Sequence, residues 1–479
     1  MLRTLLVRIG RTLSVRLSHA WRRSTAVFDD ENLLSCAGLL PVLELAEHAG
    51  LSELLDEHVV FTDERIRSGA ANPTPKLSSI IAGMLAGADS IDDLNVIRAG
   101  GMNRVFGGVY APATLGILLR EFTFGHARQL GSVLGRHLVA LADRTDVLAG
   151  IEEQALVDID SLLRPVYGNA KQGASFGHTK IASRQVLRLG LSPLVTTIST
   201  RKAAPVIAGM RLRAGKAGSG RGAASMVTEA INTAKAAGAK SILIRGDSAY
   251  GTGKVVAAAV KAGARFSFVL TKQASVNRAI DSIADDAWTP VHYPGAEFDP
   301  DTGELISDAE VAEVQYTAFA STKYKITARL IVRRVRDRNH DQELFPVWRY
   351  HPFFTNSTEP VTDADLTHRQ HAVIETVFAD LIDGPLAHLP SGLFPANAAW
   401  TMLAAITHNL LRAAGTLIDP AHAVARGATL RRRLVNVPAR IARPQGKPIL
   451  HLPAHWPHAE EWDTLWDKTF TDHRRQVAA

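Results

Sequence analysis

The chain has 479 residues, of which 46% are hydrophobic, so it can form several compact units with a buried core and is not a disordered tail. Its formal net charge of +7 is compatible with nucleic-acid binding but does not require it. A single cysteine, Cys36, excludes an intrachain disulfide framework and a cysteine-based zinc site, which suits a reducing cytoplasm.

The first 25 residues contain six arginines and no acid. This composition fits either a transit peptide or an arm that contacts DNA, and it lacks the compact apolar run of a secretory signal. Because basic segments recur further along the chain, we favour the DNA-contacting arm.

Residues 30–150 are predicted to be mainly helical. Apolar residues recur at helical spacing over 42–49, just after Pro41, which suits a first helical turn, and again over 80–85. A further helical run spans 114–146.

Near residue 155 the pattern changes to short apolar runs that alternate with helices. The predicted order is a strand within 155–168, two strands around a Ser-Pro turn in 187–200, a helix in 221–238, a strand that begins 240–251, a helix in 252–264 and a strand in 265–271. This order indicates a mixed α/β sheet.

Residues 276–355 break this alternation and are predicted to form a β-rich insertion. Helices are expected again at Thr367–Ile382 and Pro395–Leu417. The most apolar stretch, Ala398–Leu411, is short and contains His408 and Asn409, so we interpret it as a buried core helix and expect no membrane span.

Positive charge is concentrated in two segments without carboxylates. Eleven cations lie between Asp160 and Glu229, and seven lie between Ala421 and Ala459. Such segments can be solvated surface, but a surface without acids is what a polyanion needs, which favours nucleic acid. The candidate DNA contacts in the first segment are Lys171, Lys180, Arg201, Arg211, Arg213 and Arg221.

Three acids are placed where a metal site requires them. Asp160 lies in the first strand, with Asp158 on the same face as an alternative, and Asp247 comes just after the apolar strand SILIR. Glu375 borders the apolar stripe of the helix at Thr367–Ile382. Each acid alone fits a turn or a helix surface, but together they predict a site for hard divalent cations.

Other motifs are weak. GDSAYGTGK lacks the spacing of a P-loop, and HLPAHWPH is better explained by packing of the tail than by zinc. No nucleophile-elbow motif supports a Ser-His-Asp hydrolase.

The chain resembles the DDE transposases of bacterial insertion sequences, and more narrowly the family numbered thirteen-eighty in its actinobacterial form. The similar stretches cover nearly the whole chain and include DIDSLLRPVYGNAKQGASFGHTK, RGDSAYGTGKVV, THRQHAVIETVFADLIDGPLAHLPSGLFPANAAW, AGADSIDDLNVIRAGG and APATLGILLREFTFGHARQL.

The resemblance implies a ribonuclease H-like catalytic core split by a β-rich insertion between the second aspartate and the glutamate. It implies catalytic and metal-binding roles for Asp160, Asp247 and Glu375, with Mg²⁺ or Mn²⁺ as cofactor. The substrates would be the terminal inverted repeats of the element and its target DNA, bound by a homodimer that bridges two DNA ends. The protein would be cytoplasmic and associated with the bacterial nucleoid.

Two departures concern the helix of Glu375. The related signature has a tyrosine, an arginine and a lysine where this chain has His368, His371 and Ile382. Arg369 and His371 remain candidate DNA contacts, but this copy could be weak or inactive. A DNA-binding protein adopted by its host and a ribonuclease H-like nuclease therefore stay open as alternatives.

The predicted organisation has five parts. These are a helical DNA-binding and assembly region (1–150), the first part of the catalytic core (151–275), the β-rich insertion (276–364), the helical second part of the core (365–417) and a basic C-terminal region (418–479).

Overall fold

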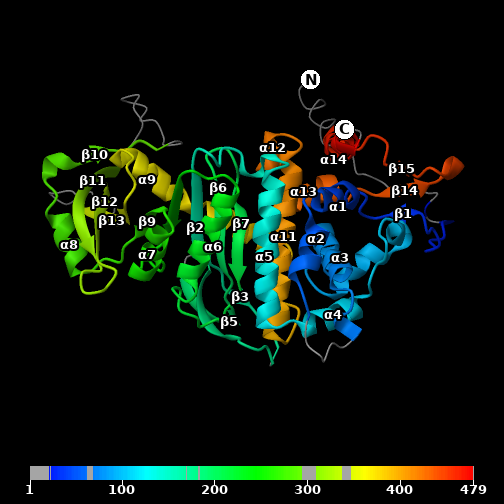
Figure 1. Ribbon diagram of the computed structural model, residues 1–479, viewed down its shortest axis with the longest axis horizontal. Coiled ribbons are helices and arrows are strands. Elements are labelled where there is room, and N and C mark those ends of the chain that lie inside the picture. The colour runs from blue at the N-terminus through cyan, green and yellow to red at the C-terminus, as the bar shows by residue number, and fades with distance from the viewer. Residues whose placement is uncertain are drawn as a thin grey trace, which may run out of the picture.

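A nine-stranded mixed sheet runs through one half of the molecule, in the order β10-β11-β12-β13-β9-β8-β2-β6-β7 (Figure 1). The computed structural model describes residues 21, 23–61, 68–168, 170–181, 184–293, 309–336 and 347–477, so the arginines before residue 21 lie outside the described residues. The strands are β2 (Ala155–Ser161), β6 (Leu194–Ser199), β7 (Val206–Arg211), β8 (Ile242–Gly246), β9 (Arg265–Val269), β10 (Thr289–Pro290), β11 (Ala309–Ala318), β12 (Ile326–Arg336) and β13 (Trp348–Thr355).

The centre of this sheet is formed by three parallel strands. β2 pairs with β8 and β8 pairs with β9, both in parallel, while the other neighbouring strands are antiparallel. Helices α6 (Ala223–Ala236) and α7 (Gly253–Lys261) provide the crossovers that parallel strands need. The alternation of apolar strands and helices therefore gives the mixed α/β fold that the sequence predicts.

The segment predicted as a β-rich insertion extends this same sheet. β13 pairs with β9 through Phe353–Thr355 and Ser267–Val269, so β10 to β13 continue the sheet beyond β9. Helix α8 (Ala274–Asp281) also belongs to this segment. The strands that the sequence predicts here are present, and they share hydrogen bonds with the strands of the first part.

A smaller sheet projects from the end of β2. It has the order β3-β5-β4 and consists of β3 (Arg164–Pro165), β4 (Ser175–Ile181) and β5 (Arg184–Leu191). The Ser-Pro turn lies between β5 and β6 as predicted, but these two strands belong to different sheets. A turn in the sequence does not show which strands pair across it.

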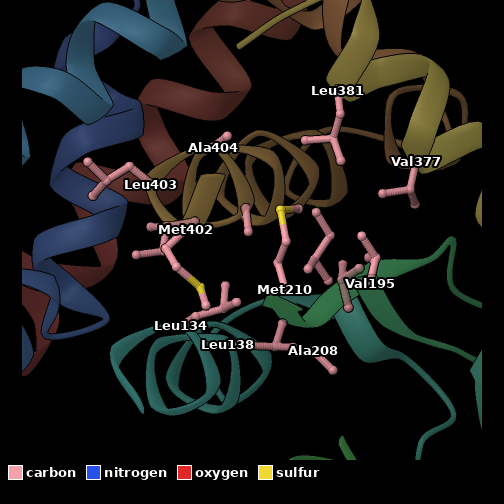
Figure 2. Close-up of a cluster of buried hydrophobic side chains, with 14 of the residues drawn as sticks. Leu134, Leu138, Val195, Ala208, Met210, Val377, Leu381, Met402, Leu403 and Ala404 are labelled. Carbon is pink, nitrogen blue, oxygen red and sulfur yellow. The ribbon is translucent and has the colours of Figure 1, made fainter. Parts of the chain in front are cut away.

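The other half of the molecule is helical and packs on the sheet through a long central helix (Figure 1). The N-terminal helices are α1 (Leu39–His48), α2 (Leu51–His58), α3 (Pro73–Ala86), α4 (Pro112–Glu121) and α5 (Phe124–Ala142). The central helix is α11 (Phe394–Thr416), which is buried on nearly all sides. Figure 2 shows its Met402 between Leu134 of α5 and Met210 of β7. None of the helices in the described part of the chain is long and apolar enough to span a membrane.

The C-terminal part returns to the N-terminal helices. It comprises α12 (Pro420–Ala423), α13 (Gly427–Leu430), β14 (Ala439–Ala442), β15 (Ile449–His451) and α14 (Ala459–Val477), and a short π-helical turn at Arg431–Val435. β14 pairs with β1 (Leu33–Leu34) and with β15. The two ends of the described chain therefore meet in one small sheet.

The central helix also closes the free edge of the large sheet at β7. Asn409, which is buried, accepts a hydrogen bond from the backbone N–H of Ile207 at 2.8 Å and donates one to the carbonyl of the same residue at 2.8 Å. The side-chain amide thus takes the place of a neighbouring strand, which satisfies backbone groups that an edge strand leaves unpaired.

We predict that Asn409→Leu destabilises the protein by about 1–3 kcal/mol for each of the two buried backbone groups that loses its partner. Urea unfolding of the variant measures this loss. Asn232→Leu, at an exposed position on α6, is the matched control and should change stability little. Equal effects of the two substitutions would contradict this role of Asn409.

Candidate active site

The register of β2 and β8 places two pairs of residues side by side. In this parallel pair Asp158 is opposite Arg245, and Ile159 is opposite Gly246. Two residues further along each strand lie Asp160 and Asp247, on the same face of the sheet as Asp158 and Arg245. An inner layer therefore holds an aspartate and an arginine, and an outer layer at the strand ends holds two aspartates.

The inner layer is a fully buried ion pair. Arg245 is 0% exposed and Asp158 is 1% exposed. The guanidinium donates two hydrogen bonds to the Asp158 carboxylate, from Nε at 2.7 Å and from Nη2 at 2.8 Å. A third bond, from Nη1, reaches the carbonyl of Thr367 at 2.6 Å. Because its carboxylate is committed to this bidentate pair, Asp158 is poorly placed to bind a metal, and we retain Asp160 as the first acid.

Asp160 lies at the end of β2, close to the two other candidate acids. Burial is the main cause that raises the pKa of Asp160 to about 7, and the charges of Asp247 and Glu375 raise it further. A hydrogen bond from the backbone N–H of Ser161 (2.6 Å) and the charge of Arg213 act in the opposite direction. The fold therefore brings the three acids into one electrostatic group, although they are far apart in the sequence.

Asp247 begins a tight turn at the end of β8. Its side chain is exposed and accepts a hydrogen bond from the N–H of Ala249 at 2.9 Å. The turn continues to Tyr250, which is 1% exposed, and to Gly251, where an added Cβ would lie 2.5 Å from the carbonyl oxygen of Val269. Only glycine permits this close approach, which holds the turn against β9.

Tyr250 is a neighbour of the acids that the sequence analysis did not identify. Burial raises the pKa of its hydroxyl to about 12, and the charge of Asp160 adds to the rise. In the sequence, the polar residues that follow the strand SILIR were the only indication that Tyr250 belongs to the site.

Glu375 is exposed in the first turn of α10 (Ile374–Ile382). The expected single helix at Thr367–Ile382 is divided: α9 spans Val361–Arg369, a 3₁₀ turn spans Gln370–Val373, and α10 follows. Arg245 holds the end of α9 through its bond to the Thr367 carbonyl. The segment that delivers Glu375 is therefore tied to the same residue that pairs with Asp158.

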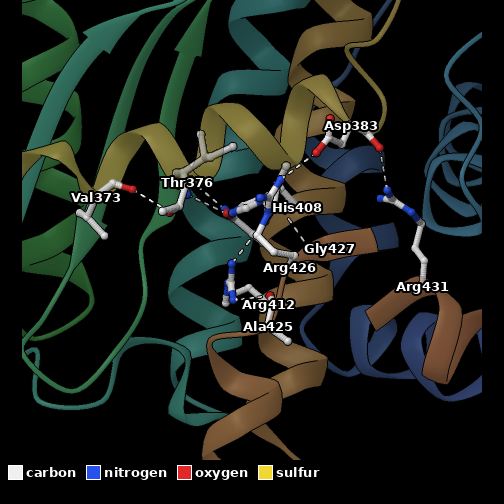
Figure 3. A network of polar contacts seen from close by, with 12 residues as sticks. Val373, Thr376, Asp383, His408, Arg412, Ala425, Arg426, Gly427 and Arg431 are labelled. Carbon is white, nitrogen blue, oxygen red and sulfur yellow. Dashed lines mark hydrogen bonds and ion pairs between the residues drawn. The ribbon is translucent and has the colours of Figure 1, made fainter. Parts of the chain in front are cut away.

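The other end of α10 is held by a network of arginines around the buried Asp380 (Figure 3). Asp380 accepts hydrogen bonds from the side chain of Arg426, from Nη2 of Arg412 at 3.4 Å and from the N–H of Gly427 at 3.2 Å. Arg431 donates to the carbonyl of Asp383 at 3.0 Å. Both ends of the segment around Glu375 are thus fixed by arginines, of which Arg426 is exposed and the others are buried.

The residues that replace the family signature face different surroundings. His368 is buried, its ring is stacked on Phe353 (centroids 4.2 Å apart, planes at 2°), and its Nδ1 lies 2.8 Å from Oγ of Ser267. Burial is the main reason that its pKa lies well below the ordinary value. His368 therefore packs on β13 and β9. His371 and Ile382 are half-buried.

Several predicted DNA contacts have partners within the protein. Arg213 is 5% exposed and donates to the carbonyls of Ser192 and Ser219, so it is a structural residue and not a phosphate contact. Lys171 donates to the carbonyl of Leu389 at 2.5 Å.

Three further candidates differ in exposure. Arg211 pairs with Glu229 at 3.1 Å and is largely buried, whereas Arg201 is exposed although it pairs with Glu359 at 3.2 Å. Arg221 and Arg369 are exposed. The side chain of Lys180 lies outside the described residues.

The acid group fits a divalent cation by its donor chemistry. Its three side chains offer only carboxylate oxygens, the ligands that Mg²⁺ and Mn²⁺ prefer, and a cation would offset the repulsion that raises the pKa of Asp160. In the described ranges of the chain, however, no three acidic, histidine or cysteine side chains already surround one ion position.

A family model described as transposase DDE domain group 1 matches residues 19–470, which is nearly the whole chain. The chain belongs to this family. The DDE transposase resemblance found in the sequence is thereby confirmed at the level of the family. Among solved structures, a piggyBac transposase synaptic complex with hairpin DNA is similar at 10% identity and a TM-score of 0.39, over 92% of this chain and 82% of that one. No curated protein matches the chain.

For this member of the DDE family we predict that Arg245→Met lowers stability by about 3–5 kcal/mol, because it leaves the Asp158 carboxylate buried without a counter-charge. Thermal unfolding measures the loss. The double substitution Arg245→Met with Asp158→Leu removes both charges and should recover most of the stability. A single variant as stable as the unsubstituted protein would show that the pair is not a buried ion pair.

A second prediction concerns pH in the absence of metal. The folded-state pKa of Asp160, about 7, lies above its ordinary value of 3.8, so folding favours the protonated acid. Asp160 therefore reduces stability progressively as pH rises from about 4 to about 7, and the loss is complete above that range. Asp160→Asn should stabilise the protein in EDTA, on the order of 1–3 kcal/mol more at about pH 8 than at about pH 5.

Melting temperatures at both pH values measure this difference. Asp281→Asn, at an exposed position on α8, is the control and should show no such dependence. If Asp160→Asn raised the melting temperature equally at both pH values, this result would argue against an electrostatic interaction of Asp160 with Asp247 and Glu375.

Proposed function

We propose that the protein is an active DNA transposase that cleaves and joins the ends of its own insertion sequence. The observation that supports the proposal is that burial and the charges of Asp247 and Glu375 raise the pKa of Asp160 in a chain of the DDE family. Three carboxylates from three separate segments have no structural need to approach one another, since their repulsion costs stability. A catalytic cation site would explain why the chain keeps these carboxylates close together despite the loss of stability.

The five strands β7-β6-β2-β8-β9 with the helices around them would form the ribonuclease H-like core. Asp160 and Asp247 stand at the carboxyl ends of neighbouring parallel strands, where ligands of open α/β sheets bind. The finer assignment to the insertion-sequence family numbered thirteen-eighty rests on the sequence stretches quoted above.

In this proposal Asp160, Asp247 and Glu375 hold Mg²⁺ or Mn²⁺, which when bound supplies charge neutralisation at the phosphodiester and activation of the attacking oxygen. The side chains of Asp247 and Glu375 are exposed and accessible to DNA, and Asp160 is more deeply placed. Arg245 and the network around Asp380 keep the supporting segments rigid, so the carboxylates are positioned before substrate binds.

DNA is the proposed partner, with terminal inverted repeats and target DNA as substrates and a homodimer bridging two ends. These parts of the proposal rest on the resemblance to insertion-sequence transposases. Exposed cations such as Arg221 and Arg369 are available to phosphates, and the N-terminal arginines add to the positive charge of the chain.

We predict that Asp247→Asn lowers cleavage of element-end DNA in Mg²⁺ by about 10³-fold or more, because the metal supplies several kcal/mol of transition-state stabilisation. Binding of the same DNA should be nearly unchanged. A labelled DNA duplex that carries the terminal repeat from the DNA flanking the gene reports both quantities. Excess EDTA should abolish cleavage by the unsubstituted protein.

The conservative control is Asp281→Asn, which changes an exposed acid on α8 and should leave cleavage intact. Normal cleavage by Asp247→Asn, or cleavage that persists in EDTA, would refute the proposed site. Cleavage without joining would indicate a nuclease, and specific binding without cleavage would indicate a host-adopted DNA-binding protein.

A further inference from the structure

A cavity of about 440 Å³ is lined by residues from the segments that carry two of the three acids. Its wall includes Ser248, which follows Asp247, and His371, which precedes Glu375 by one helical turn. The wall of the cavity therefore contains chain neighbours of two of the proposed catalytic acids. The rest of the wall comes from the end of β9, from β12 and β13, and from the end of α9.

The strand pairing explains why side chains from the extended sheet reach this cavity. Arg333 of β12 is directly opposite His351 of β13, and Ile331 is opposite Phe353. All four therefore face the same side of the sheet. α9 covers the part of this face around Ile331 and Phe353. Where α9 ends, the face around Arg333 and His351 is left open as the cavity.

Positive charge dominates the wall of the cavity. Three cations line it, Lys272, Arg333 and Arg369, and Asp365 is the only acid among the described residues of the wall. Asp365 is 1% exposed and accepts a hydrogen bond from the hydroxyl of Tyr293 at 2.8 Å. No ion pair joins any of the three cations to a carboxylate of the described chain.

A neighbouring histidine responds to this charge. His351 is exposed at the rim, and its pKa is lowered first by partial burial and then by the charges of Arg333, Lys272, Arg349 and Arg369. The guanidinium of Arg369 is held over the ring of Tyr293, 3.8 Å from its centroid, which orients it without neutralising it. Burial raises the pKa of Asp365, and the charges of Arg333 and Arg369 oppose this rise, so this one acid lies near two of the three cations and the wall keeps an excess of positive charge.

We propose that this cavity binds a backbone phosphate of the DNA strand on which the three acids act. The inference rests on the proposed function and adds a specific contact, made by Lys272, Arg333 and Arg369. An anion is favoured because three cations face one acid in the wall of the cavity, which leaves an excess of positive charge there. A DNA phosphate is favoured over a free anion because Ser248 and His371, which line the cavity, come from the segments of Asp247 and Glu375, where the proposed function places a DNA strand. The β-rich segment would then help to position the substrate in the active site.

The first experiment measures the salt dependence of binding to a labelled DNA duplex. Lys272→Gln removes an exposed cation of the cavity, and Lys261→Gln removes an exposed cation at the end of α7 as a matched control. Loss of one phosphate contact should lower the slope of log K against log salt by about 0.9. Affinity at low salt should fall about tenfold, the effect of one charge-assisted contact. Lys261→Gln should leave both unchanged.

A second experiment locates the phosphate. Single phosphates of the DNA near the cleavage point are replaced in turn by neutral methylphosphonates. One replacement should weaken binding to the unsubstituted protein and have no further effect on Lys272→Gln, because both changes remove the same contact. When the same phosphate replacements are combined with Lys261→Gln, the two losses of binding free energy should add at every phosphate position.

Three outcomes would overturn the inference. The slope could be equal for Lys272→Gln and Lys261→Gln, or the cycle could be additive at every phosphate. Inorganic phosphate could also raise the melting temperature of the unsubstituted protein but not of Lys272→Gln while DNA affinity is equal, which would assign the cavity to a free phosphate. Failure of the proposed function is distinct, because it appears as normal cleavage by Asp247→Asn whatever the cavity binds.

Discussion

The buried ion pair between Asp158 and Arg245 is the interaction on which the arrangement of the site depends. Two charges at the centre of a sheet are costly to bury, and this cost is offset only while the guanidinium keeps all three of its hydrogen bonds. Two of these bonds fix β2 against β8, where a slip of one residue would turn Asp160 and Asp247 to the other face. The third fixes the end of α9, which leads to Glu375. One residue therefore relates all three segments that carry the candidate acids.

The helix of Glu375 shows why one anchor is not enough. The 3₁₀ turn at Gln370–Val373 interrupts the segment and could allow α10 to pivot. Its far end is held by Asp380, which is bound by arginines of α11 and of the C-terminal part. Between these anchors, the buried Leu381 points toward the central helix and the buried Val377 points toward Val195 of the sheet (Figure 2). Polar groups set the position of the helix, and the apolar stripe provides most of its stability.

Charge patterns along the chain were a partial guide to the surface. The cations of 421–459 have no acid nearby in the sequence, but the fold brings Asp380 and Asp383 to Arg426, and Asp30 to Arg440. Arg211 finds Glu229 in the same way. An excess of positive charge lies instead in the cavity to which Lys272, Arg333 and Arg369 come from three different segments, with Asp365 as an acid in the same wall. Whether a cation is free for a phosphate depends on partners that local sequence does not specify.

The sequence by itself indicated most of the elements and singled out the candidate acids. Apolar spacing predicts the helices and the strands, since burial of one face depends on local periodicity, and it separated Asp160, Asp247 and Glu375 from the other acids by their positions at strand ends and on an apolar helix. Only the tertiary structure decided which strands pair, so the β-rich segment proved to continue the main sheet from β9 and β5 proved to leave the sheet of β6. The tertiary structure also decided that Asp158 forms an ion pair with Arg245, that His368 packs on Phe353 and that Arg213 is buried. The physical reason is that hydrogen bonds, ion pairs and ring contacts act between groups close in space, and their partners lie scores or hundreds of residues apart.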